Sequence, residues 1–174
     1  MRKIATSLAV LAVVASAWSA SAAPLNVVAL GASNTSGSGQ GRHPGGVARD
    51  QAYPAQLEAL LRARGIDAHV RNAGVSGDTT AAMLKRVDAA VPNDTQIVIL
   101  QPGANDRRHG LGDASANVAA MTSRLAARGI KVVLLDKLDA PASTRDPDGQ
   151  HFNAQGHAAI AATLLPLVIA AAVK

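Results

Sequence analysis

The chain has 174 residues, no cysteine and a formal net charge of +5. The absence of cysteine excludes disulfides, thiol catalysis and zinc sites built on thiolates. The basic residues are scattered and no basic stripe with interleaved aromatic residues occurs, so we predict no nucleic-acid binding. Aromatic residues make up only 2% of the chain, which predicts an aliphatic core and argues against a long groove that stacks sugars.

Residues 1–22 have the layout of a secretory signal peptide: a basic start, an apolar stretch over 4–18 and a run of small residues. We expect cleavage after Ala22, because a cut one residue later would leave Pro24 immediately past the site. The alternative is an uncleaved membrane anchor, but the apolar stretch is short for a span, which needs about 20 residues. We therefore expect an exported protein, periplasmic or secreted, whose mature chain 23–174 forms one domain.

The mature chain alternates strand and helix patterns. Nearly continuous apolar runs, typical of strands buried on both faces, occur at 25–30, 67–71, 96–100 and 130–135. Apolar residues at helical spacing predict helices over 51–64, 79–91, 115–128 and from 153 or 154 to about 172. Asp50 is the expected N-cap of the first helix, and Gly65 ends it. The alternation predicts the α/β class, with a parallel sheet covered by helices on both faces.

Four loops at one predicted edge of this sheet are rich in glycine and polar residues, over 31–41, 72–78, 103–106 and 146–153. Ligands bind at this edge in open parallel sheets. Ser33 lies there, just past the first strand. A serine in this place is a nucleophile only if a base and oxyanion donors converge on it.

Later loops supply candidates for both. The imidazole of His151 suits removal of a serine proton, and a carboxylate fixes its tautomer. Asp148 stands three residues before His151 on a turn, a spacing that can bring the two together. Asp146 competes for this role, but Asp148 has the matching spacing. A main-chain N–H at Gly74 and the side-chain amide of Asn105 are suitable oxyanion donors.

Four short blocks in these loops resemble those of the SGNH hydrolases, also called GDSL esterases and lipases. The blocks are Gly31-Ala32-Ser33-Asn34, Asn72-Ala73-Gly74, Gly103-Ala104-Asn105-Asp106 and Asp148-Gly149-Gln150-His151. Each block alone is weak, but four in order cover residues 25 to about 157. The resemblance implies a flavodoxin-like, three-layer α/β/α sandwich with a four- to five-stranded parallel sheet.

The resemblance also implies a role for each block. Ser33 would be the nucleophile, His151 the base and Asp148 its partner. The N–H groups of Ser33 and Gly74 and the side chain of Asn105 would form the oxyanion hole. The expected activity is that of an exported serine esterase acting on short- to medium-chain acyl esters or thioesters. It resembles the thioesterase, lysophospholipase and arylesterase branch, and it needs no cofactor or metal.

Two other functions stay open. One is an O-acetyl esterase for carbohydrates or cell-envelope polymers with the same triad. The other is an inactive binding module, because Ala32 stands where the family usually has an aspartate that helps to brace the serine loop. Asp78 or Asp106 could supply this bracing instead. The stretch from Asp136 to Asp148 is also short for the family, which leaves four strands or a very short fifth. We expect a small acyl ester or thioester as partner, no stable membrane span after cleavage, and a monomer.

Other polar residues have simpler interpretations. Asp106 is expected to tie its loop by accepting main-chain N–H groups. Residues 107–109 are expected to form a solvated basic face, although they could meet an anionic headgroup. His157 is expected to be a helix-face histidine bonded to a loop. The acidic residues around His151 are not expected to hold a metal, because no helix-borne histidine pair accompanies them.

Overall fold

The structure is a computed structural model, and it describes residues 23–39, 45–112, 114–136 and 142–173. The predicted signal peptide over 1–22 lies outside the described residues. Within them, one parallel sheet is formed by the strands β1 (Leu25–Gly31), β2 (Ala68–Gly74), β3 (Ile97–Gln101) and β4 (Lys131–Leu134). The order is β2-β1-β3-β4, which places β1 and β3 in the centre.

The strand ends that carry the predicted loops meet at one edge of the sheet. In the register, Gly31 of β1 pairs with both Gly74 of β2 and Gln101 of β3. Strand β2 runs three residues past the predicted 67–71, because Asn72 and the two residues after it keep pairing with β1. The loop expected to begin at residue 72 therefore begins after Gly74, while the ends of the other strands differ from prediction by at most one residue.

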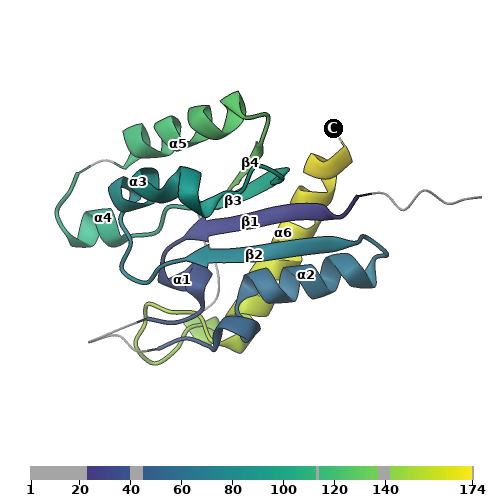
Figure 1. Cartoon of the computed structure of the whole chain (residues 1–174). Coiled ribbons are helices and arrows are strands. Elements are labelled where there is room, and N and C mark those ends of the chain that lie inside the picture. Colours follow the sequence, from purple (N-terminus) through teal and green to yellow (C-terminus); the bar gives the residue numbers. More distant parts are fainter. Residues whose placement is uncertain (1–22, 40–44, 113, 137–141, 174) are drawn as a thin grey trace, which may run out of the picture.

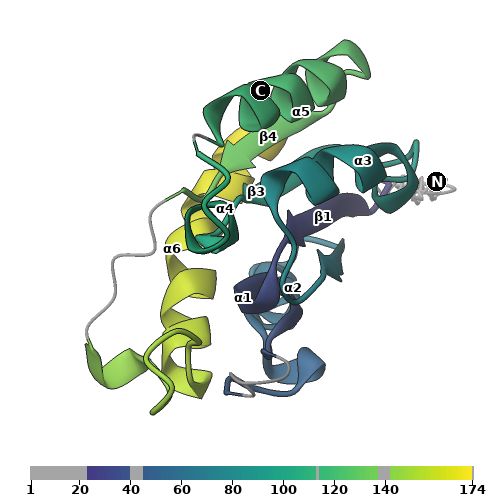
Figure 2. The same ribbon diagram turned by 90° about the vertical axis from the view of Figure 1, so that its left-hand side faces the viewer.

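Helices cover both faces of the sheet, as Figures 1 and 2 show. They are α1 (Ser33–Ser36), α2 (Tyr53–Ala63), α3 (Thr80–Ala90), α4 (Asn105–Arg108), α5 (Ser115–Ala127) and α6 (Ala154–Val173), with 3-10 turns η1 (Arg49–Gln51) and η2 (Ala142–Thr144). Helices α2 and α6 pack on one face of the sheet, and α3 and α5 pack on the other. The predicted three-layer α/β/α sandwich is confirmed, and among the described residues its parallel sheet has four of the predicted four to five strands.

The prediction that Asp50 caps the first long helix is wrong. Asp50 lies in the turn η1, and Ala52 then takes an extended conformation before α2 starts at Tyr53. No side chain caps this end, and Pro54 stands in the first turn, where a residue without an N–H costs nothing. The expected stop at Gly65 is confirmed by its φ of +76°, which glycine adopts without strain.

Helix α6 is a core helix, as its sequence predicted. It buries one side against the sheet and α2 through Ile160, Ala161, Leu164, Leu165 and Val168. Among the described residues it is also the one helix long and apolar enough to cross a membrane by length and composition alone. Its packing is what brings the loop before it, with His151, toward the edge of the sheet where β1 ends.

Candidate active site

Ser33 stands at the carboxyl end of the central strand β1, as the first residue of the one-turn helix α1. The carbonyl of Ala32 accepts the N–H groups of Thr35 and Ser36 at 3.0 and 2.9 Å, which closes the turn. Ser33 is buried, with 8% of its surface exposed. Within the described part of the chain, neither its hydroxyl nor its N–H forms a hydrogen bond. Both groups are therefore available to a ligand.

A buried chain of hydrogen bonds fixes α1 to its neighbours. The hydroxyl of Thr35 lies 3.1 Å from that of Tyr53 and donates to Gln101 Oε1 at 3.2 Å. Burial raises the pKa of Tyr53 above its usual range, although the hydrogen bond with Thr35 acts in the opposite direction. A Cβ at Gly31 would lie 2.1 Å from the Thr35 hydroxyl. Glycine is therefore needed at the end of β1 for this anchor to fit.

Asp148 and His151 are in direct contact. Oδ2 of Asp148 lies 2.5 Å from Nδ1 of His151, while Oδ1 accepts the main-chain N–H groups of Gln150 and His151 at 2.9 and 3.0 Å. Burial by itself would raise the pKa of Asp148, but the hydrogen bonds and the charge of His151 outweigh it and hold that pKa well below its usual range. An ionised carboxylate on Nδ1 leaves Nε2 to take up a proton.

The competing acid, Asp146, has a different partner. Its Oδ2 accepts the N–H of Gly46 at 2.6 Å. Asp148, and not Asp146, is thus the carboxylate in contact with His151. In the described part of the chain, no group of three or more acidic or histidine side chains is placed to hold a metal ion.

The other two predicted oxyanion donors, Gly74 and Asn105, lie at or just past the ends of the two strands that flank β1. Asn105 starts α4, just after β3, and its side-chain N–H donates to the carbonyl of Asp78 at 2.7 Å. Its Oδ1 accepts from Arg108 at 3.2 Å, so the amide is held at both ends and retains one further N–H. The N–H of Gly74 donates to Asn72 Oδ1 at 3.0 Å. A substrate oxygen at Gly74 must therefore share or displace that contact.

Asp106 holds the loop of Asn105 in place, as the sequence predicted. Its carboxylate accepts the N–H of Thr80 at 2.9 and 3.2 Å and the Thr80 hydroxyl at 2.6 Å. Asn117 of α5 donates to the same hydroxyl at 3.0 Å. These bonds attach α4 to the start of α3.

Arg86 braces the serine turn, in which Ala32 replaces the aspartate common in the family, and no sequence motif predicts this role. From α3, its Nη2 donates to the carbonyl of Gly31 at 3.1 Å, and its Nε pairs with Asp78 at 2.6 Å. Asp78 in turn receives the amide of Asn105 on its carbonyl. One residue pair thus links the serine turn to the loop of Asn105, as the prediction for Asp78 allowed. Ala32 itself is buried in the apolar cluster under α3.

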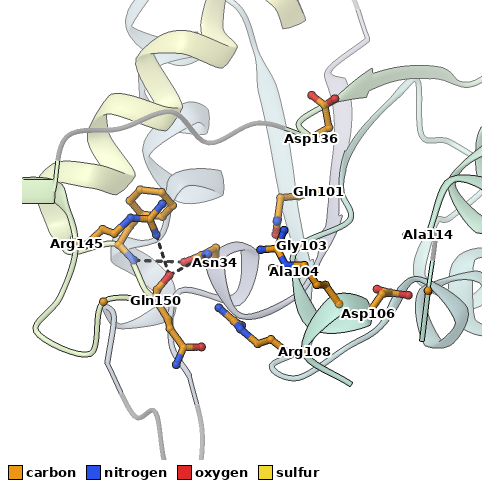
Figure 3. A pocket seen from close by; sticks show the side chains of 14 residues that line it. Asn34, Gln101, Gly103, Ala104, Asp106, Arg108, Ala114, Asp136, Arg145 and Gln150 are labelled. Atoms are coloured by element: carbon orange, nitrogen blue, oxygen red, sulfur yellow. Dashed lines mark hydrogen bonds between the residues drawn. The ribbon is translucent and has the colours of Figure 1, made fainter. Parts of the chain in front are cut away.

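A cavity of about 600 Å³ lies beside the loops that carry Ser33, Asn105 and His151. Its wall contains Asn34, Ala104, Gln150 and Phe152, the chain neighbours of Ser33, Asn105 and His151 (Figure 3). The cavity is mostly polar, with Gln101, Arg107, Arg108, Arg145 and Asp136 around it. Arg107 and Arg108 are exposed, as expected of a solvated basic face, but both also border the cavity and Arg108 donates to Asn105.

His157 lies buried behind the site. Its Nδ1 accepts the N–H of Tyr53 at 3.2 Å, and its ring stacks near that of Tyr53 and meets Phe152 edge to face. Burial lowers the pKa of His157 to about 4; the Gly37 main chain opposes this shift and the charge of His151 adds to it. His157 is thus a helix-face histidine, as expected, and its hydrogen-bond partner is the main chain at the start of α2.

Comparisons with known proteins agree with this geometry. The model of the GDSL-like Lipase/Acylhydrolase family matches residues 29–163. The chain is 36% identical over 93 residues to esterase TesA of Pseudomonas aeruginosa, and the match covers 52% of this chain and 46% of TesA. The chain thus spans about half the length of this curated relative.

Solved structures give the same picture. The SGNH-hydrolase family esterase AlinE4 superimposes with a TM-score of 0.57 at 34% identity, covering 70% of this chain and 63% of that one. The aryl esterase of M. smegmatis gives a TM-score of 0.69 at 16% identity, covering 84% of this chain and 99% of that one. At that identity the second match speaks for the fold alone.

Proposed function

Since the chain belongs to the GDSL-like lipase/acylhydrolase family, we propose that it is a serine esterase in which Ser33, His151 and Asp148 form the catalytic triad. The observation that carries the proposal is the Asp148–His151 contact, in a loop that is hydrogen-bonded to Asn34, the neighbour of Ser33. The proposed substrates are short- to medium-chain acyl esters or thioesters. The relatives named above are esterases, which supports the same reaction class.

In the proposed first step, the Ser33 hydroxyl attacks the carbonyl carbon of the ester while Nε2 of His151 takes its proton. The Ser33–His151 hydrogen bond that this step requires is expected to form in the substrate complex. The ionised Asp148 stabilises the resulting imidazolium. The tetrahedral oxyanion receives the N–H of Ser33 and the remaining side-chain N–H of Asn105, which Asp78 and Arg108 hold in a fixed orientation. Gly74 joins them when Asn72 releases its N–H.

Collapse of this intermediate breaks the ester bond. His151 returns its proton to the leaving alcohol or thiol, and the acyl group stays on Ser33 as an ester. Water then attacks the acyl-enzyme, with His151 again taking a proton. The second collapse releases the carboxylic acid and restores the Ser33 hydroxyl. The substrate and one water molecule are the only other reactants that these steps need.

The cavity beside the site supports a small acyl group and a polar leaving group. Its polar side chains offer hydrogen bonds, and Phe152 and Ala104 are among the few apolar residues of its wall. A long fatty chain gains free energy only from apolar burial, at about 25 cal/mol per Å². The same polar wall favours the second candidate function, removal of O-acetyl groups from a carbohydrate or cell-envelope polymer.

A substrate series tests the proposal. We expect the mature protein to hydrolyse p-nitrophenyl acetate and butyrate with higher kcat/KM than the dodecanoate, and the Ser33→Ala and His151→Ala variants to lose this activity. Acetylated xylan or peptidoglycan turned over faster than the aryl esters would select the second candidate. Equal hydrolysis by wild type and both variants would contradict the triad, and no hydrolysis of any ester would favour a binding module.

We further propose export of the mature chain from residue 23. The proposal rests on the basic start, apolar stretch and small residues of the first 22 positions. Mass measurement of the protein recovered from the periplasm or medium of an expressing bacterium tests it. A new N-terminus at Ala23 supports export, and a full-length protein in the cytoplasm contradicts it.

A further inference from the structure

We infer that Asn34 is a positioning residue whose side-chain amide holds the loop carrying His151 against the turn carrying Ser33. The inference rests on the proposed function, because it concerns the alignment of the same nucleophile and base. Ser33 lies in α1 near the start of the domain, and His151 lies in the loop before α6 near its end. Contacts between these two segments must therefore set the distance from hydroxyl to imidazole.

The amide of Asn34 forms hydrogen bonds with the residues directly before and after His151. Its Nδ2 donates to the carbonyl of Gln150 at 3.5 Å, and its Oδ1 accepts the N–H of Phe152 at 3.3 Å. Figure 3 shows Asn34 facing Gln150 across this contact. These two bonds join α1 directly to the main chain on either side of His151. Holding the main chain on both sides of His151 holds the point from which its imidazole projects.

The loop that carries His151 is held by several further contacts. Arg145 donates to the carbonyl of Gln150 at 3.1 Å, and its guanidinium lies 4.4 Å from the centre of the Phe152 ring. The carbonyl of His151 accepts the N–H of Asp146 at 2.8 Å. Phe152 is fully buried in the core under α6. The loop therefore moves as a unit rather than residue by residue.

The turn that carries Ser33 is also held in place, because Thr35 anchors α1 to Tyr53 and Gln101. The amide of Asn34 joins these two segments directly, so we expect it to contribute to their relative position. A misplacement of about 1 Å between reacting groups can cost roughly 100-fold in rate. Both hydrogen bonds are long, so we expect the effect of losing them to fall mainly on alignment and less on folding.

Two variants of Asn34 and one control test this inference. Asn34→Leu keeps the shape of the side chain and removes both bonds. Asn34→Asp keeps the acceptor for Phe152, loses the donor and adds a negative charge. The control Asn26→Leu removes a similar pair of side-chain bonds to Asp94 at the opposite end of β1. For each protein, the measurements are kcat/KM for p-nitrophenyl acetate from pH 5 to 9, the rate of Ser33 labelling by a fluorophosphonate, and Tm.

We expect Asn34→Leu to lower both rates by roughly 10- to 100-fold with kcat falling more than KM changes. Asn34→Asp is expected to lose less, with the acid limb of its rate profile moved to higher pH, because a carboxylate near His151 favours the imidazolium that cannot act as a base. Asn26→Leu is expected to keep the wild-type rates.

Wild-type rates and pH profiles in both Asn34 variants would overturn the inference and leave the proposed function standing. The same holds if the Asn34 variants lose activity only in proportion to their loss of folded protein. If the wild type itself is not labelled at Ser33, the proposed function fails and the inference fails with it. The labelling of the wild type thus separates the two failures.

Discussion

Asp148 holds His151 at two points at once. One carboxylate oxygen lies 2.5 Å from the ring Nδ1, and the other accepts the main-chain N–H of the same residue at 3.0 Å. The three-residue spacing makes this possible, because the turn between them brings the main chain of His151 back to the side chain of Asp148. The imidazole is thereby fixed in tautomer and in direction, and this arrangement is central to the proposed mechanism.

Replacing Asp148 by asparagine tests that arrangement. Asparagine keeps the size of the side chain but removes the charge that fixes the Nδ1 proton and stabilises the imidazolium. We expect kcat to fall by roughly 10²- to 10⁴-fold with a small change in KM. Asp146→Asn is the matched control, since Asp146 binds Gly46 instead. Equal losses in the two variants would argue against a specific role for Asp148.

The Arg86–Asp78 pair is expected to stabilise the serine turn. Arg86→Met leaves the Gly31 carbonyl and the Asp78 carboxylate without their partner, with the two side chains of the pair only 24% and 11% exposed. We expect a loss of about 1–3 kcal/mol in the free energy of unfolding together with a lower kcat. The exposed pair Arg124–Asp88 is the control, because Arg124→Met should cost about 0.5 kcal/mol or less. Denaturant unfolding measures the stability of both variants, and similar losses in the two would contradict the bracing role of Arg86.

Gly74 is required for lack of space rather than for its conformation. A Cβ there would lie 2.1 Å from the main-chain nitrogen of Ser36 in α1. Gly74→Ala is therefore expected to displace α1, with a loss of about 3 kcal/mol or more in stability and a loss of Ser33 labelling. Gly65→Ala is the comparison, since Gly65 has open space and a φ of +76°, so only the conformational cost of about 1–2 kcal/mol applies. A Tm for Gly74→Ala equal to or above that of Gly65→Ala would refute this.

Buried His157 is expected to make stability depend on pH. Its pKa is about 4 in the folded protein and 6.5 in an exposed histidine. Between these values the unfolded chain binds more protons, so stability falls as the pH drops from about 6.5 to about 4, by at most roughly 3 kcal/mol. His157→Asn can keep the acceptor for Tyr53 and removes the titration. Urea unfolding of both proteins at pH 7 and pH 4.5 should show that the free energy of unfolding changes less with pH in the variant than in the wild type. An equal change in the two proteins would exclude His157 as the source of the pH dependence.

Much of this fold can be predicted from local pattern. Buried parallel strands are nearly continuous in apolar residues, so the four strands are visible in the sequence. The extension of β2 to Gly74 cannot be predicted from the sequence, because asparagine is typical of loops and Asn72 is kept in the sheet only by its pairing with β1. The start of α2 is missed for a similar reason, since Asp50 has the chemistry of a cap but lies in a separate turn.

In the candidate site, too, local contacts can be predicted from the sequence and long-range contacts cannot. The Asp148–His151 contact is local, and its three-residue spacing predicts it. Arg86 and Asn34 act across long sequence separations, on Gly31 and on the loop of His151, so no spacing rule reveals them. Asn72 and Gly74 belong to one sequence block, but the block does not reveal the hydrogen bond between them, which adds a rearrangement to the predicted oxyanion hole.

The identity of the nucleophile is the central claim, and a mapped covalent adduct tests it most directly. The mature protein is treated with a fluorophosphonate and digested, and the modified residue is located by mass spectrometry in the wild type, Ser33→Ala and His151→Ala. We predict one adduct on Ser33 in the wild type, none in Ser33→Ala, and labelling slowed by at least about 100-fold in His151→Ala. An adduct on another residue, or labelling that persists in Ser33→Ala, would contradict the account.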